Sequence, residues 1–155
     1  MKIQIILLGK NKDKWIDEAM ADFLKKLNSL TEINIEFLKD EKISKSQDID
    51  QIKRTEEERI LNKVNAGHFL IVLDERGKLL SSADLARQIE QKIDFGQNMT
   101  FVIGGALGLS EKVRNKADLV LSFSKMTFTH QMIRVFLLEQ IYRAFQIIKG
   151  TQYHK

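Results

Sequence analysis

The chain has 155 residues, of which 43% are hydrophobic and 30% charged, a composition that fits a single globular domain and excludes a disordered or fibrous protein. It has no cysteine and three histidines, which excludes disulfides and thiolate nucleophiles and argues against a metal site. No apolar stretch approaches the roughly 20 residues of a membrane helix and no signal-peptide cleavage region is visible, so we expect a cytoplasmic protein. The net charge of +4 is spread along the chain and permits an RNA partner without requiring one.

Strands and helices alternate along the first half of the chain. Short apolar runs predict strands, and apolar residues three or four positions apart predict helices that bury one face. The pattern predicts strands at residues 2–8, 32–38 and 69–73, helices at residues 13–30 and 48–65, and a polar connection at residues 39–47.

The same alternation continues toward the C-terminus. Serine before a helical pattern is typical of a helix cap, and Glu111 suits the first turn of the helix that Ser110 would cap. The pattern predicts a helix that begins at Ser81 or Ser82 and runs to residue 93, a strand at residues 99–103, a short helix after Ser110, and a strand at residues 117–121.

This order of elements predicts an α/β fold: one domain, residues 1–155, with a parallel sheet covered by helices on both faces. Ligands of such folds bind outside the carboxyl ends of the strands. In this sequence those ends are followed by the turns at residues 73–77 and 104–108. We therefore expect these two turns to face one ligand site.

The last predicted helix, residues 130–149, is apolar around nearly its whole circumference. A helix that rests on one face of a sheet needs only an apolar stripe, so this helix should be buried on two sides. A second subunit in a symmetric homodimer would provide the other side. The alternative is a helix that lies at the centre of its own monomer. Arg134 and Arg143 interrupt its apolar pattern, and each must reach a partner or the surface.

A glycine turn follows the strand at residues 99–103. Gly104, Gly105 and Gly108 let the backbone approach a ligand closely, although a plain tight turn has the same composition. The turn lacks the lysine of a P-loop and the full dinucleotide fingerprint, which argues against phosphate binding.

Two further segments could carry chemistry. The loop from Ser122 to Phe128 can present backbone groups to a purine edge while its apolar side chains enclose the ring, or it can simply connect a strand to a helix. At the C-terminus, His154 follows Tyr153 and could accept a proton near neutral pH, although chain ends commonly have no function.

Four segments in this order closely resemble the RlmH family, small SPOUT-class enzymes that methylate N3 of a pseudouridine in 23S ribosomal RNA. The segments are residues 102–109, 121–134, 138–145 and 153–155. The resemblance implies S-adenosylmethionine as methyl donor, a trefoil-knotted C-terminal region and an obligate homodimer. It also implies that the substrate is 23S ribosomal RNA within the assembled ribosome, because the family lacks an added RNA-binding domain.

The resemblance also assigns roles to individual residues. Our hypothesis is that His154, with Tyr153, contacts the target base near N3 and either accepts its proton or orients a water that does, while Arg134 and Lys155 hold RNA phosphates. The implied contacts to the cofactor fall on Leu73, Gly104, Phe123, Ser124, Lys125, Met126, Thr127 and Phe128.

The chain departs from the family where proline is frequent: it has Ala106, Thr129 and Gln152 at those positions and no proline at all. Threonine can cap a helix in place of proline, whereas Gln152 leaves the tail less pre-organised. Two other functions remain open. A non-catalytic RNA-binding protein would need no cofactor pocket, and a nucleotide hydrolase would need acidic metal ligands, for which Asp74 and Glu75 are the only adjacent pair at the strand ends.

Overall fold

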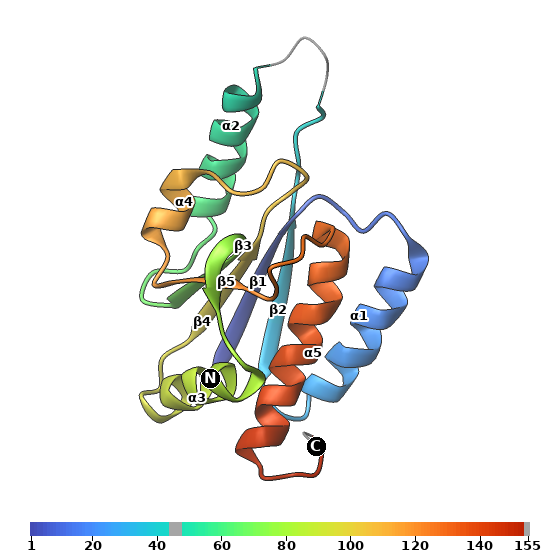
Figure 1. Ribbon diagram of the computed structural model, residues 1–155, viewed down its shortest axis with the longest axis vertical. Helices are drawn as coiled ribbons and strands as arrows, with labels where there is room; N and C mark the ends of the chain where they lie inside the picture. The colour runs from blue at the N-terminus through green and yellow to red at the C-terminus, as the bar shows by residue number, and fades with distance from the viewer. Residues whose placement is uncertain (44–47, 154–155) are drawn as a thin grey trace.

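A parallel sheet of five strands forms the centre of the computed structural model, which describes residues 1–43 and 48–153 (Figure 1). Neighbouring strands are parallel throughout, in the order β2-β1-β4-β3-β5, which confirms the predicted α/β fold. The strands are β1 (Lys2–Leu8), β2 (Glu32–Leu38), β3 (Phe69–Leu79), β4 (Met99–Ile103) and β5 (Leu119–Ser122). Residues 44–47 of the expected polar connection lie outside the described part of the chain.

Helices cover both faces of the sheet because the side chains of each strand alternate between two cores. Along β1, Ile3, Ile5 and Leu7 point into one core, whereas Ile6 and Leu8 point into the other. The first core is covered by α1 (Lys14–Leu27), α3 (Ser82–Asp94) and α5 (His130–Ile148), and the second by α2 (Ile49–Leu61) and α4 (Glu111–Lys116).

Polar residues cap the helices that surround the candidate ligand site. The Ser110 hydroxyl accepts a hydrogen bond from the backbone N–H of Val113 (3.2 Å) at the start of α4, as predicted. The Thr129 hydroxyl accepts from the backbone N–H of Met132 (3.3 Å) at the start of α5. Thr129 therefore supplies a cap at the position where the resembled family often has proline.

α5 lies between α1 and α3 on one face of the sheet, so its own chain covers much of its circumference (Figure 1). Its buried apolar residues are Leu137, Leu138, Ile141, Ala144 and Phe145. A position at the centre of the monomer thus explains most of its apolar sequence. The side chains that its own chain leaves only half-buried include Met132, Val135 and Phe136. The homodimer that would cover them remains a prediction.

β3 is longer than predicted. The sequence indicates a strand that ends at Leu73, but the chain forms a bulge after this residue and then pairs with β5 again, with Lys78 opposite Leu121 and Leu79 opposite Ser122. Gly77 permits this pairing, because a Cβ at this position would lie 2.6 Å from the backbone carbonyl carbon of Leu121. The bulge, residues 74–77, consequently stays beside the carboxyl ends of the neighbouring strands instead of leading away from the sheet.

Arg134 lies in the interior, not on an RNA-facing surface. The residue is 1% exposed, and one guanidinium nitrogen donates to the Asn11 side-chain oxygen (2.7 Å) while another donates to the Leu8 carbonyl. Burial lowers the pKa of this guanidinium to about 10. The side chain ties the first turns of α5 to the end of β1, and its burial argues against the phosphate contact expected from the sequence.

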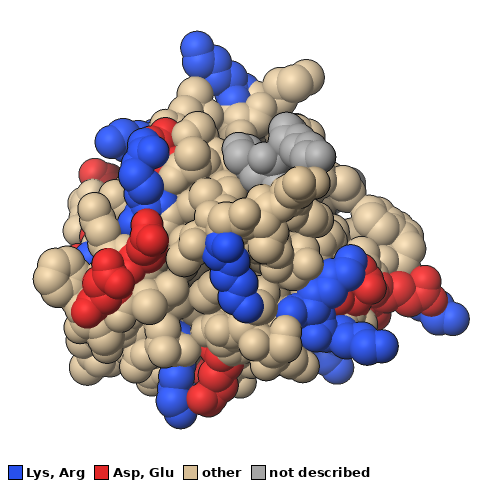
Figure 2. Space-filling model, turned by 90° about the horizontal axis from the view of Figure 1, so that it is seen from below, with Lys and Arg blue, Asp and Glu red and all other residues tan. Residues whose placement is uncertain are grey.

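The surface seen from below carries basic and acidic side chains that are interspersed, without an area of one sign (Figure 2). Some exposed charges are paired, such as Lys2 with Glu32 at 3.1 Å. Within residues 1–43 and 48–153, no helix combines the length and the apolar character needed to cross a membrane.

We expect Arg134→Ala to lower the free energy of unfolding by about 2–4 kcal/mol, because it leaves a cavity and removes the partners of Leu8 and Asn11. Urea unfolding at a fixed protein concentration measures this change. Arg87→Ala is the control, because its side chain is 65% exposed, and it should stay within about 0.5 kcal/mol of the wild type. A fully stable Arg134→Ala protein would contradict the tie between α5 and β1.

Gly77→Ala should also destabilise the chain by about 2–4 kcal/mol, because the added methyl group meets backbone atoms of Leu121 and Ser122 that cannot move separately. Gly105→Ala is a matched control, since the nearest heavy atom to its new Cβ would be 3.7 Å away on Leu8. Thermal unfolding of both variants compares them. Equal melting temperatures would show that the sheet tolerates a side chain at residue 77.

Candidate functional site

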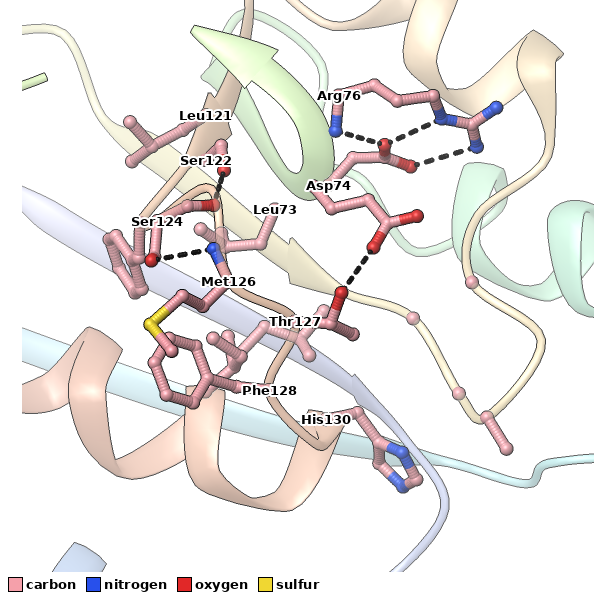
Figure 3. Close-up of a pocket in the computed structure, with 18 of the residues that line it drawn as sticks. Leu73, Asp74, Arg76, Leu121, Ser122, Ser124, Met126, Thr127, Phe128 and His130 are labelled. Atoms are coloured by element: carbon pink, nitrogen blue, oxygen red, sulfur yellow. Dashed lines mark hydrogen bonds and ion pairs between the residues drawn. The ribbon is translucent and has the colours of Figure 1, made fainter. Parts of the chain in front are cut away.

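A pocket of about 350 Å³ opens at the carboxyl ends of β3, β4 and β5 (Figure 3). Residues 73–76 form one wall, residues 103–108 a second and residues 121–128, without Lys125, a third, while His130 and Ile133 of α5 complete it. Its volume lies in the range of pockets that bind small molecules and cofactors. The two strand-end turns predicted to face one ligand site therefore do meet.

The glycine turn brings bare backbone to the pocket. The N–H of Gly108 donates to the carbonyl of Gly105 (3.1 Å), and Gly108 has a φ of 73°, a conformation that favours glycine. A Cβ on Gly104 would lie 3.0 Å from the buried Leu109 side chain and 3.1 Å from the backbone of Gly108. The turn is thus too tight for a larger residue at 104, because its side chain would meet Leu109 and Gly108.

The loop between β5 and α5 is shaped by its two serines. The Ser122 hydroxyl donates to the Ser124 carbonyl (2.8 Å), and the Ser124 hydroxyl accepts from the backbone N–H of Met126 (2.9 Å) (Figure 3). Met126 is 73% exposed and Phe128 41% exposed at the open side of the pocket. This loop can enclose an apolar ring while offering it backbone hydrogen-bonding groups.

The wall formed by residues 73–76 carries a buried carboxylate held by two arginines. Asp74 accepts from Arg76 (3.1 Å) and lies 3.4 Å from Arg114, with its side chain 5% exposed. Burial raises the pKa of the Asp74 carboxyl, but the hydrogen bonds from Arg76 and the two nearby guanidinium charges outweigh burial, so the pKa lies below its ordinary value. Asp74 is therefore a fixed anion rather than a free acid or base.

This pairing argues against the alternative of a metal-dependent hydrolase. Of its expected acidic pair, Asp74 is bound by arginine and Glu75 accepts a hydrogen bond from the Thr127 hydroxyl (3.1 Å). In the part of the chain that the structure describes, no group of three or more histidine, aspartate or glutamate side chains is arranged to hold a metal ion.

His130 lines the pocket but was not among the expected site residues. Burial, followed by the positive charges of Arg134 and Lys12, lowers its pKa, so the imidazole is neutral at pH 7. The side-chain amide nitrogen of Gln131 lies 3.2 Å from Nε2 of His130. An amide nitrogen can only donate, so Nε2 of His130 must accept this hydrogen bond. The sequence indicated only that His130 begins the last helix. Whether its side chain reaches the pocket depends on how α5 packs against the sheet, which the sequence does not show.

The structure brings together most of the expected cofactor residues: Leu73, Gly104, Phe123, Ser124, Met126, Thr127 and Phe128 all line the pocket. Lys125 belongs to the same loop, but it is exposed and is not part of the lining. Arg134 is buried behind the pocket, and His154 and Lys155 lie outside the described residues.

Tyr153 does not line the pocket, and its side chain packs along the second half of α5. Its hydroxyl donates to the Glu139 carboxylate (3.3 Å), its ring packs edge-on against Tyr142 at a centroid distance of 4.9 Å, and the Arg143 guanidinium lies 4.8 Å from its ring centre. Partial burial and then the charge of Glu139 raise the pKa of Tyr153. Glu139 is nine residues after His130 along α5, about 14 Å at 1.5 Å per residue, so the Tyr153 hydroxyl is held away from the pocket of its own chain.

Known structures share this architecture. A probable methylase family protein from Haemophilus influenzae Rd KW20 is 15% identical and superposes with a TM-score of 0.56, covering 99% of this chain and 70% of that one. The tRNA (m1G37) methyltransferase of Aquifex aeolicus is 9% identical with a TM-score of 0.57, covering 92% of this chain and 70% of that one. At these identities the likeness concerns the fold alone.

Sequence comparison identifies the family. Ribosomal RNA large subunit methyltransferase H of Halothermothrix orenii is 48% identical over 159 residues, which cover the whole of both chains. A family model described as "Predicted SPOUT methyltransferase" matches residues 1–154. The chain therefore belongs to the SPOUT methyltransferase family.

Proposed function

We propose that this chain is an S-adenosylmethionine-dependent methyltransferase that modifies N3 of a pseudouridine in 23S ribosomal RNA. The observation that carries the proposal is the pocket in which the glycine turn, the residue 73–76 wall and the Ser122–Phe128 loop converge. The name of the relative from Halothermothrix orenii, a methyltransferase of large-subunit ribosomal RNA, supports the substrate. The sequence motifs that resemble the RlmH family support the methyl donor and the target atom.

The residues of the pocket fit S-adenosylmethionine. Leu73, Ile103 and Leu121 provide apolar surface for an adenine ring, and Gly104 leaves room for close backbone contact. Leu73, Gly104 and the loop at residues 123–128 would hold the cofactor, with Lys125 contributing through its backbone. When bound, the cofactor supplies an electrophilic methyl group on a positively charged sulfur.

The chain must then orient the target base and remove the proton from its N3. His154, with Tyr153, is the proposed contact to the base and either accepts this proton or positions a water that does. Holding base and methyl donor in line contributes to the rate through proximity alone. The neutral His130 at the inner wall is suited to hydrogen bonding rather than to charge attraction.

The distance between tail and pocket supports a homodimer. Because the Tyr153 side chain packs along the second half of its own α5 and does not line the pocket, a tail that contacts the base at a pocket would come from a second copy of the chain. Apolar surface for such a partner exists beside the pocket at Met126, Phe128 and Phe136, of which Phe128 and Phe136 pack edge-to-face at 5.3 Å. The trefoil knot of the resembled family is part of this proposal.

The assembled ribosome is the proposed substrate, and the cytoplasm the proposed location. The chain has a mild net charge of +4, so a preformed ribosomal surface would supply part of the recognition. Arg134, which is buried, has no part in this contact, and Lys155 of the tail remains the expected phosphate ligand.

Deletion of the gene should remove a single methyl group from one pseudouridine of 23S ribosomal RNA. Mass-spectrometric mapping of ribosomal RNA from cells with and without the gene measures this loss, and a plasmid copy should restore it. A modification map that does not change would refute the proposed substrate.

Mixed dimers test whether the tail acts in the partner's pocket. His154→Ala should bind S-adenosylmethionine normally but transfer methyl about 10²–10⁴ times more slowly, as is typical for loss of a proton-transfer group. Gly104→Val should lose the pocket instead, because its side chain meets Leu109. If each site combines one pocket with the partner's tail, an exchanged mixture of the two inactive variants should regain about a quarter of wild-type activity.

The quarter arises because half of the exchanged dimers are mixed and each mixed dimer has one intact site. A tail that serves its own pocket would leave the mixture inactive, which would contradict the shared site. Circular dichroism and light scattering of each variant alone establish that both fold and dimerise before they are mixed.

A further inference from the structure

Glu75 differs from every other charged side chain at the pocket because no opposite charge binds it. The charged or titratable side chains in the lining are Asp74, Glu75, Arg76 and His130. Asp74 is occupied by Arg76 and Arg114. Within residues 1–43 and 48–153, Glu75 makes no ion pair, and its hydrogen-bond partner is the neutral hydroxyl of Thr127, 3.1 Å from Oε2.

Neither Arg76 nor His130 cancels the charge of Glu75. Nε and Nη2 of Arg76 both donate to Asp74, at 3.1 and 3.5 Å, so the guanidinium is directed toward Asp74 although it also lies in the field of Glu75. His130 is half-buried and uncharged at neutral pH. No lysine side chain belongs to the described lining, and Lys125 of the neighbouring loop is exposed.

The position of Glu75 directs this charge at the contents of the pocket. Glu75 lies on the bulge of β3, and Thr127 lies on the loop that follows β5, so their hydrogen bond joins two walls of the pocket (Figure 3). Glu75 is exposed, so its carboxylate can turn toward a bound cation.

We propose that Glu75 makes the pocket selective for the positively charged methyl donor over its neutral product. This inference depends on the proposed function. In the transfer, the sulfur–methyl bond breaks, the methyl group bonds to N3, the N3 proton leaves to a base, and the sulfur keeps the electron pair and loses its positive charge. The ammonium and carboxylate groups of the cofactor are the same before and after. Glu75 therefore attracts the donor more than the product, and the attraction ends when the methyl group has moved.

Glu75→Gln tests this selectivity, because it removes the charge and keeps the shape and the contact to Thr127. Calorimetric titration of the full-length dimer with S-adenosylmethionine and, separately, with S-adenosylhomocysteine gives two dissociation constants. We expect the variant to bind the donor about three- to tenfold more weakly, as for the loss of one opposite charge near a protein surface, and to bind the product within about twofold of the wild type.

Two further variants separate charge from contact. Glu111→Gln removes a neighbouring charge that does not line this pocket, and it should leave both constants unchanged. Thr127→Val removes the hydrogen bond to Glu75 but keeps the carboxylate, so it should preserve the ratio of the two constants. In the wild type the ratio should fall as salt is raised, and in Glu75→Gln it should be less sensitive to salt.

The possible results are distinct. A Glu75→Gln protein that loses affinity for donor and product equally, or for neither, would overturn the selectivity and leave the proposed function intact. A Thr127→Val protein with the same loss of selectivity would also overturn it, because loop position and not charge would then be responsible. If the wild type binds neither ligand, the cofactor is wrong and both proposals fail.

Discussion

The backbone contact at Gly77 is the constraint on which the ligand site depends. Only a residue without a side chain lets β3 return to β5 after its bulge, because Leu121 occupies the space where a Cβ would be. That return holds residues 74–76 beside the loop that leaves β5, and it aligns both with the glycine turn after β4. Without it, β5 would lose two of its five residue pairs with β3, and the pocket would lose one wall.

The sequence was sufficient to predict the parts of the fold that follow from local pattern. The strands at residues 2–8 and 99–103 are mostly apolar, and the turn at Gly104 follows from glycine spacing, so their positions were predicted correctly. The bulge at residues 74–77 was missed because its cause is a contact with Leu121, a residue distant in the sequence. Periodicity reports which residues are apolar, but it does not report which backbones approach one another.

Arg134 and His130 show the same limit for single side chains. An arginine in an apolar helix can reach outward or inward, and only the packed structure shows that Leu8 and Asn11 receive it. His130 is one helical turn before Arg134, and its depth in the pocket likewise follows from the placement of α5 against the sheet. The family resemblance supplied expected roles, but it could not supply the orientation of these two side chains. Tyr153 adds a third case, because its distance from the pocket depends on the length of a helix.

The length of α5 has a consequence of its own. The helix begins at the pocket with His130 and ends beside the tail, where Tyr153 packs on Tyr142, so it sets both the separation and the relative rotation of these two regions. Inserting one residue would move the tail by about 1.5 Å and turn it by about 100° around the helix axis. In a symmetric pair the error would occur in both copies at once. α5 thus fixes both the distance and the rotation between the pocket and the tail. Its residues can be substituted far more readily than their number can change.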